Sequence, residues 1–130
     1  MSGYFDQGDA PAPSIVVVTN LPADIAAGTY DVYVYALGGR SDRGGQYTVN
    51  GVGPLDLLVG GDTDQGAATG VNGYVQAKRT DPNYGADDFG NYLLVTGQTG
   101  STVTITATNL FSGFDTHPRA PLNGIQIVVH

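Results

Sequence analysis

The sequence contains no glutamate, no cysteine and a single lysine. Without cysteine the chain can form no disulfide and carries no thiol chemistry. Glutamate and lysine are, with leucine and alanine, the residues that build the helices of soluble proteins, so their scarcity disfavours a helical fold. All of the negative charge lies on twelve aspartates, which favour turns and can bind metal ions. The missing glutamate also removes half of the carboxylates that acid–base catalysis ordinarily uses.

What the chain does contain is typical of a turn-rich β protein. It has 20 glycines and 8 tyrosines, and threonine and valine recur in alternation along several segments. Its 130 residues are enough for one domain whose hydrophobic core is stable without disulfide bonds. We therefore interpret residues 1–130 as a single all-β module.

The charge of the chain disfavours two classes of partner. Its formal net charge is −7, and its few cations are too sparse to track the phosphates of a nucleic acid or an anionic membrane. These cations are Arg40, Arg43, Lys78, Arg79 and Arg119. No apolar run approaches the roughly 20 residues of a membrane-spanning helix. We expect neither nucleic-acid binding nor membrane insertion.

The first residues lack the basic and apolar regions of a signal peptide. The abundance of glycine, threonine and asparagine, with almost no lysine, is nevertheless typical of secreted bacterial surface modules. The protein is therefore either cytosolic or an excised or mature segment, and the composition favours the second. We expect an extracellular or cell-surface location, with this chain excised from a longer secreted protein.

Alternation with period two, separated by turn signals, predicts about eight strands. We expect them at residues 14–19, 30–36, 46–50, 55–59, 73–79, 91–96, 102–108 and 125–129. The third and fourth form a pair around residues 52–54, and only residues 24–27 suit a short helical turn. This spacing of strands predicts an antiparallel β-sandwich.

The alternation also predicts which side chains face the core. In residues 30–36, Val32, Val34 and Ala36 share one face with Tyr30, whereas the other face carries Asp31, Tyr33 and Tyr35. In residues 102–108, the inward set is Val103, Ile105 and Ala107, with threonines outward. In the last strand, we expect Ile125, Ile127 and Val129 to point inward.

Several phrases along the chain resemble a known module. They are Gly-Tyr-Phe-Asp at residues 3–6, Tyr-Asp-Val-Tyr-Val-Tyr at 30–35, Gly-Asn-Tyr at 90–92 and Leu-Asn-Gly-Ile-Gln-Ile at 122–127. In this order they resemble a module of large surface and secreted proteins from planctomycetes and related bacteria. More loosely, the chain is similar to galactose-binding-like jelly rolls, including the family 6 and family 35 carbohydrate-binding modules. The resemblance implies a jelly-roll sandwich that binds a polysaccharide or glycan without catalysis.

A loop near residue 84 has the chemistry of a sugar site. Sugars present apolar C–H faces and hydroxyl rims, so they need an aromatic platform beside polar groups. The loop and the strand before it offer Tyr84 as the platform, with Asp81, Asn83, Asp87 and Asp88 around it and Tyr74 and Arg79 beside it. The simpler interpretation is a solvated loop whose Phe89 and Tyr92 pack into the core. A second location for a sugar is the face with Tyr33 and Tyr35, which otherwise fills a sheet face or an interface.

The aspartates raise the question of a structural calcium ion. Asp62 and Asp64 begin an Asp-x-Asp-x-Gly pattern, although a chain without glutamate cannot complete an EF-hand. The jelly-roll resemblance implies a calcium near the chain ends, with Asn123 among its ligands and either Asp6 or Asp9 as the N-terminal contributor. The dipeptide Asn123-Gly124 is equally explained as a tight turn into the last strand.

No set of residues predicts catalysis. His117 and His130 do not follow the spacing of a zinc site, and no serine lies in a Gly-x-Ser-x-Gly pattern. Asp87 and Asp88 are adjacent, so on an extended segment their carboxylates point apart and cannot flank a glycosidic bond. We expect a protein that is not an enzyme.

The alternative to sugar binding is a structural or adhesive module of a surface protein or extracellular fibre, which works by self-association. The threonines of residues 102–108 would suit lateral packing between copies. A glycan array distinguishes the two functions.

Overall fold

The structure is a computed structural model that describes residues 12–36, 44–59, 74, 76–77, 89–109 and 120–130. Within these residues the chain forms eight strands and one short helix, which confirms the all-β fold. The elements are β1 (Ser14–Val18), α1 (Ala23–Ala26), β2 (Tyr30–Tyr35), β3 (Gly44–Val49), β4 (Val52–Val59), β5 (Phe89–Gly90), β6 (Tyr92–Gln98), β7 (Val103–Asn109) and β8 (Gly124–Val129). No helix in these residues has the length and hydropathy needed to cross a membrane.

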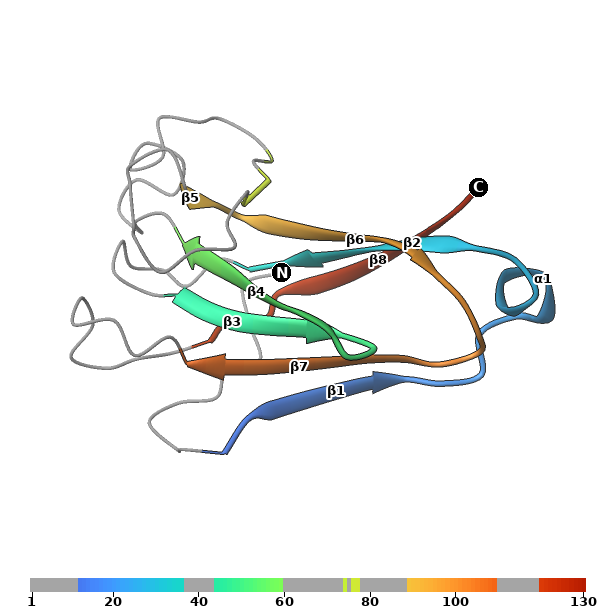
Figure 1. The fold of residues 1–130 in the computed structure, drawn as a ribbon, viewed down its shortest axis with the longest axis horizontal. Helices are drawn as coiled ribbons and strands as arrows, with labels where there is room; N and C mark the ends of the chain where they lie inside the picture. Colours follow the sequence, from blue (N-terminus) through green and yellow to red (C-terminus); the bar gives the residue numbers. More distant parts are fainter. Residues whose placement is uncertain (1–11, 37–43, 60–73, 75, 78–88, 110–119) are drawn as a thin grey trace.

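The strands form two sheets that lie as layers on each other (Figure 1). The large sheet has the order β1-β7-β3-β4-β5, and the small sheet has the order β6-β2-β8. Neighbouring strands are antiparallel except for β4 and the two-residue β5, which are parallel. This is the predicted sandwich, and the jelly-roll connection that the resemblance implies stays a prediction.

The hairpin between β3 and β4 turns at a different place from the one we expected. Val49 pairs with Val52, so the turn consists of Asn50 and Gly51 rather than residues 52–54. Both turn residues have positive φ angles, 50° and 80°. A two-residue hairpin turn of this kind matches the right-handed twist of its strands and strongly favours Asn-Gly.

Side chains from both sheets form one core. The predicted inward residues of β2 and β7 are all buried, with Tyr30, Val32, Val34 and Val103 fully inaccessible to solvent. The neighbouring strands add Tyr47 and Val49 from β3 and Leu93 and Val95 from β6. The alternation read from the sequence therefore gives the correct inner face for both central strands.

The last strand fits the prediction only in part. Ile125 and Ile127 are partly buried against the core, but Val129 is 45% exposed. The reason is that β8 lies at the edge of the small sheet, where fewer side chains cover its inner face.

The segment at residues 73–79 does not form the predicted strand in its described part. There, Gln76 makes an isolated parallel bridge to Tyr92, and the Ala77 N–H donates to the Tyr92 carbonyl at 2.9 Å. The strand β5 lies instead at the end of the segment predicted as a loop. Gly90 permits this arrangement, because a Cβ atom there would lie 2.4 Å from the Ala77 nitrogen. A contact that close requires glycine.

We expect the core to respond unequally to truncation of two isoleucines. Ile105 is 1% exposed, whereas Ile127 is only partly buried. Ile105→Ala should lower the free energy of unfolding by ~2–5 kcal/mol, as for other truncations in a closed core. Ile127→Ala should cost about half as much, since less apolar area leaves the core.

Urea unfolding of the two variants, with the slope of the unfolding free energy checked for constancy, measures the difference. Equal losses for the two variants would contradict the distinction between a central and an edge strand.

Candidate functional site

The outer face of the small sheet carries a group of aromatic side chains. Because side chains alternate along a strand, Tyr33 and Tyr35 point away from the core that Val32 and Val34 enter. The pairing of β2 with β6 sets Tyr92 opposite Tyr35. Residues directly opposite each other in a sheet share a face, so Tyr92 joins the two tyrosines of β2.

Four tyrosine rings form a connected cluster here, and we refer to Tyr33, Tyr35, Tyr74 and Tyr92 as the tyrosine face. The centroid of Tyr92 lies 5.7 Å from that of Tyr33 and 6.0 Å from that of Tyr35. The rings of Tyr33 and Tyr35 are 6.4 Å apart and nearly parallel, at 14°. These separations lie in the range in which aromatic rings attract each other.

Tyr74 is the most exposed member of the tyrosine face. Its ring meets Tyr35 edge-on, with centroids 5.2 Å apart at 63°, yet the residue remains 78% exposed. The bonds of Gln76 and Ala77 to Tyr92 attach this segment to β6 and so bring Tyr74 to the sheet. The backbone near Tyr74 is thus fixed to the sheet, while the Tyr74 side chain stays exposed to solvent.

Polar groups border the aromatic rings. The Tyr35 hydroxyl donates to the Oε1 atom of Gln126, at 2.7 Å, from the neighbouring strand β8. Gly124 lies opposite Tyr35, and a Cβ atom there would make only ordinary contact with the ring, at 3.9 Å. Burial raises the pKa of Tyr35, and the nearby tyrosines Tyr74, Tyr33 and Tyr92 raise it further. The hydroxyl therefore stays protonated at neutral pH and can act as a hydrogen-bond donor.

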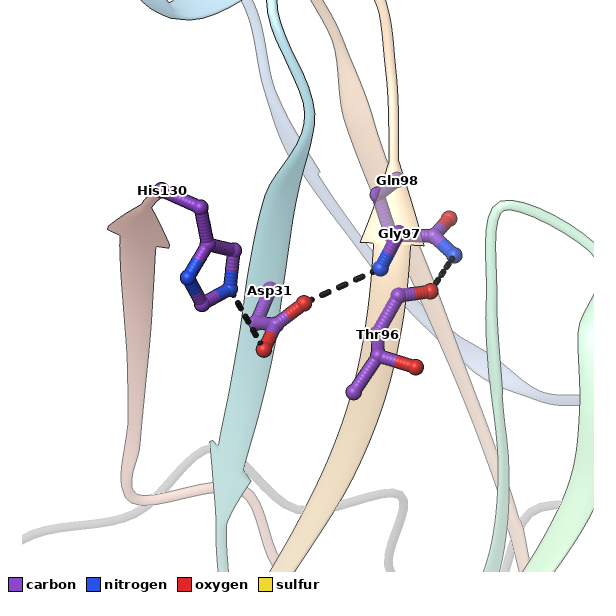
Figure 2. Close-up of polar contacts among 5 residues, drawn as sticks. All are labelled: Asp31, Thr96, Gly97, Gln98 and His130. Carbon is purple, nitrogen blue, oxygen red and sulfur yellow. Dashed lines mark hydrogen bonds and ion pairs between the residues drawn. The ribbon is translucent and has the colours of Figure 1, made fainter.

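At the other end of β2 the same face carries an aspartate with two partners (Figure 2). Asp31 accepts a hydrogen bond from the Gly97 N–H on its Oδ1 atom, at 3.0 Å. Its Oδ2 atom lies 2.8 Å from the Nε2 atom of His130. The aspartate side chain is 12% exposed and the histidine side chain 57%.

The Asp31–Gly97 bond belongs to an irregularity in the sheet. Tyr30 pairs with Gln98 but Val32 pairs with Val95, so Asp31 faces two residues of β6 instead of one. Gly97 adopts a positive φ of 67°, as expected of glycine in a β-bulge. The bulge disrupts the regular backbone pairing, and the Asp31 carboxylate binds the Gly97 N–H there.

The pKa of Asp31 is lowered from its ordinary value of 3.8, first by the hydrogen bond from Gly97 and then by that from His130. A lowered pKa in the folded state means that the carboxylate stabilises the protein above its ordinary pKa. This contribution disappears as the pH falls through the lowered value.

We expect Asp31→Asn to lower the melting temperature at pH 7, with the difference from the unmodified protein narrowing below about pH 4. Asp24→Asn, at an exposed position in α1, serves as the control for loss of one charge. Melting curves between pH 7 and pH 2.5 measure both variants. A difference for Asp31→Asn that stays constant over this range would show that the carboxylate is not coupled to folding.

The structure describes two of the residues predicted to bind a ligand or a metal. Tyr74 lies on the tyrosine face, and Asn123 lies directly before β8, where its N–H donates to the Tyr35 carbonyl at 2.9 Å. The remaining predicted residues lie outside the described part of the chain. They are Asp81, Asn83, Tyr84, Asp87, Asp88 and Arg79 for the sugar, and Asp6, Asp62 and Asp64 for calcium.

Sequence reasoning recognised only part of the tyrosine face. It placed Tyr33 and Tyr35 together, but it considered Tyr92 only as a core residue, in the alternative interpretation of the loop, and placed Tyr74 beside the loop. Tyr92 is half-buried on the outer face, since Leu93 and Val95 occupy the inner face of β6. The alternation of residues 92–95 already indicates that Tyr92 faces away from Leu93 and Val95. No pattern in the sequence indicates the contacts that Gln126 and Gly97 make.

The described residues contain no group of three histidine or carboxylate side chains that could hold a metal ion. Comparison with known proteins adds no relative: no protein-family model, curated protein or solved structure matches this chain.

Proposed function

We propose that this chain is a non-catalytic carbohydrate-binding module and that the tyrosine face binds the sugar. The observation that carries the proposal is the contact among four tyrosine rings on an outer sheet face, one of them 78% exposed. An exposed cluster of large aromatic side chains on a soluble domain marks an interaction surface.

The chemistry of this face suits a sugar better than a wholly apolar ligand. Tyrosine combines an apolar ring, against which the C–H groups of a pyranose can lie, with a hydroxyl at its rim. The protonated Tyr35 hydroxyl and the exposed Gln126 amide supply hydrogen-bond donors and acceptors beside the rings. An apolar platform with a few oriented polar groups is the general form of a site for a small polar ligand.

The wider setting of the proposal follows from the sequence. The resemblance to galactose-binding-like modules of secreted bacterial proteins favours a polysaccharide or glycan as ligand and a location outside the cell. In such a protein the module would hold a neighbouring domain or a cell near the polymer. We expect modest affinity, because an open face buries little surface and sugar hydroxyls exchange water for protein at small net gain.

Substitution of one exposed ring tests the proposal. Tyr74→Ala should weaken binding about tenfold, equivalent to ~1.4 kcal/mol, with little change in melting temperature. Val52→Ala is the matched control, because Val52 is a 48% exposed apolar residue on the large sheet. Affinity electrophoresis in gels that contain plant, algal or bacterial polysaccharides measures the retardation of each variant.

A third variant separates the two predicted locations of the site. Tyr84→Ala should leave binding unchanged if the tyrosine face is the platform, and should abolish it if the loop at residues 81–90 is the platform. Loss of binding with Tyr84→Ala alone would move the site to the loop. No retardation of the unmodified protein by any polysaccharide would contradict the proposed function itself.

The proposal includes a structural calcium ion, which the jelly-roll resemblance implies. Its support is the Asp62 and Asp64 pattern and the position of Asn123 directly before β8. Asn123 is exposed and could therefore reach a calcium ion. The other ligands of this ion, Asp6 among them, would be residues outside the described part of the chain.

Millimolar calcium should raise the melting temperature of the chelator-treated protein by several degrees, because a ligand that binds only the folded state stabilises it. Magnesium should act less, since it demands a regular octahedral site. An unchanged melting curve would leave these residues as turn residues.

A further inference from the structure

The strand β1 ends the large sheet, and no other strand in the described residues pairs with its outer edge. Proteins commonly protect such an edge with lysine, proline or a bulge, because its backbone groups can pair with another chain. The sequence of β1 is Ser-Ile-Val-Val-Val, which contains no lysine and no proline. The nearest proline is Pro13, directly before the strand. Its pairing with β7 is continuous over all five residues.

The outer face of β1 is also apolar. Val16 and Val18 pack against the core, so the alternation turns Ile15 and Val17 outward, where they are 55% and 52% exposed. In the next strand the outward residues opposite them are Thr106 and Thr104. Two of the large apolar residues that the described structure exposes therefore lie on one short strand.

The lack of charge on β1 permits a second copy of the chain as the partner at this edge. Two copies of a chain with a net charge of −7 repel each other. Residues 12–23, which include β1, contain no charged side chain. Two copies can therefore pair along β1 without placing like charges of these strands opposite each other, and they meet with apolar side chains.

We propose that β1 pairs antiparallel with β1 of a second copy of this chain, around a twofold axis near Val16. The segment is nearly symmetric about that residue, so Ile15 would lie opposite Val17 of the second copy and Val17 opposite its Ile15. An interface of this kind uses the same surface on both copies and closes as a dimer. The two large sheets become one continuous sheet, and the edges of both β1 strands are paired.

The twofold arrangement of the dimer also affects sugar binding by the tyrosine face. This step rests on the proposed function. A twofold axis that relates antiparallel neighbours stands perpendicular to the sheet, so both small sheets lie on the same side of the joined large sheets. Both tyrosine faces would then point the same way and could engage one polymer together. Such bivalent binding raises the overall affinity without any new contact.

Sedimentation velocity over a range of protein concentrations, without any sugar, tests the dimer. The unmodified protein should shift from the mass of one chain to that of two as the concentration rises. Val17→Lys should weaken the dimer at least tenfold, because it sets a charge opposite Ile15 of the second copy and places two like charges diagonally across the axis. Val52→Lys is the matched control, with the same residue replaced, the same change in net charge and a similar exposure, 48% against 52%.

Hydrogen exchange of the unmodified protein keeps the test decisive if Val17→Lys fails to fold. The amides of β1 that point away from β7 should become protected as the concentration rises, and those of β8 should not. A single-chain mass at every concentration would overturn the proposal, as would equal weakening by Val52→Lys. Because no sugar is present, failure of the dimer and failure of sugar binding are separate results.

Discussion

The register of β2 is the constraint on which the rest of the structure depends. β2 is the middle strand of the small sheet and pairs with β6 on one side and β8 on the other. Its inner face buries Tyr30, Val32 and Val34 completely, and its outer face presents Tyr33 and Tyr35. A slip of one residue would exchange the two faces and place the valines in solvent. The apolar core thus fixes the position of the tyrosine face, although no tyrosine of that face belongs to the core.

Polar side chains tie the two sheets together where the apolar contacts end. The buried Tyr47 of the large sheet donates its hydroxyl to the carbonyl of Pro121, which lies three residues before β8. Asn50, in the hairpin turn of the large sheet, donates to Gln98 of the small sheet at 3.1 Å. Asn50 also exchanges two hydrogen bonds with the backbone of Thr104, both at 2.8 Å. An unpaired polar group in such a place would be costly, so these bonds favour one alignment of the sheets over neighbouring ones.

Local patterns in the sequence predict the strands well, whereas the sequence alone does not predict the contacts between distant segments. The inner faces of β2 and β7 follow from strict alternation, which a single segment displays by itself. The Asn50-Gly51 turn is a local signal that was misplaced, whereas the other missed features depend on how distant segments are arranged. Phe89 and Gly90 form a strand because β4 lies beside them, and Val129 is exposed because β8 has no outer neighbour in its sheet. The candidate site divides in the same way. Tyr33 and Tyr35 share a face by their spacing, but Tyr92 joins them only through the pairing of strands nearly 60 residues apart.

The composition of the chain also bears on the edge of the large sheet at β1, which no strand of the described residues covers. A chain with a single lysine, Lys78, has almost none of the residue that most often protects an edge strand. Aspartates could protect the edge instead, because like charges on two copies repel each other. Residues 12–23, which include β1, contain no aspartate. The same scarcity of long charged side chains leaves the tyrosine face bordered by hydroxyl and amide groups, and by one aspartate that is already bonded to Gly97 and His130. These groups are the basis on which we propose a neutral ligand rich in hydroxyl groups. Among the described residues, β1 carries no charged side chain, and Asp31 is the one carboxylate on the side of β2 that carries the tyrosines.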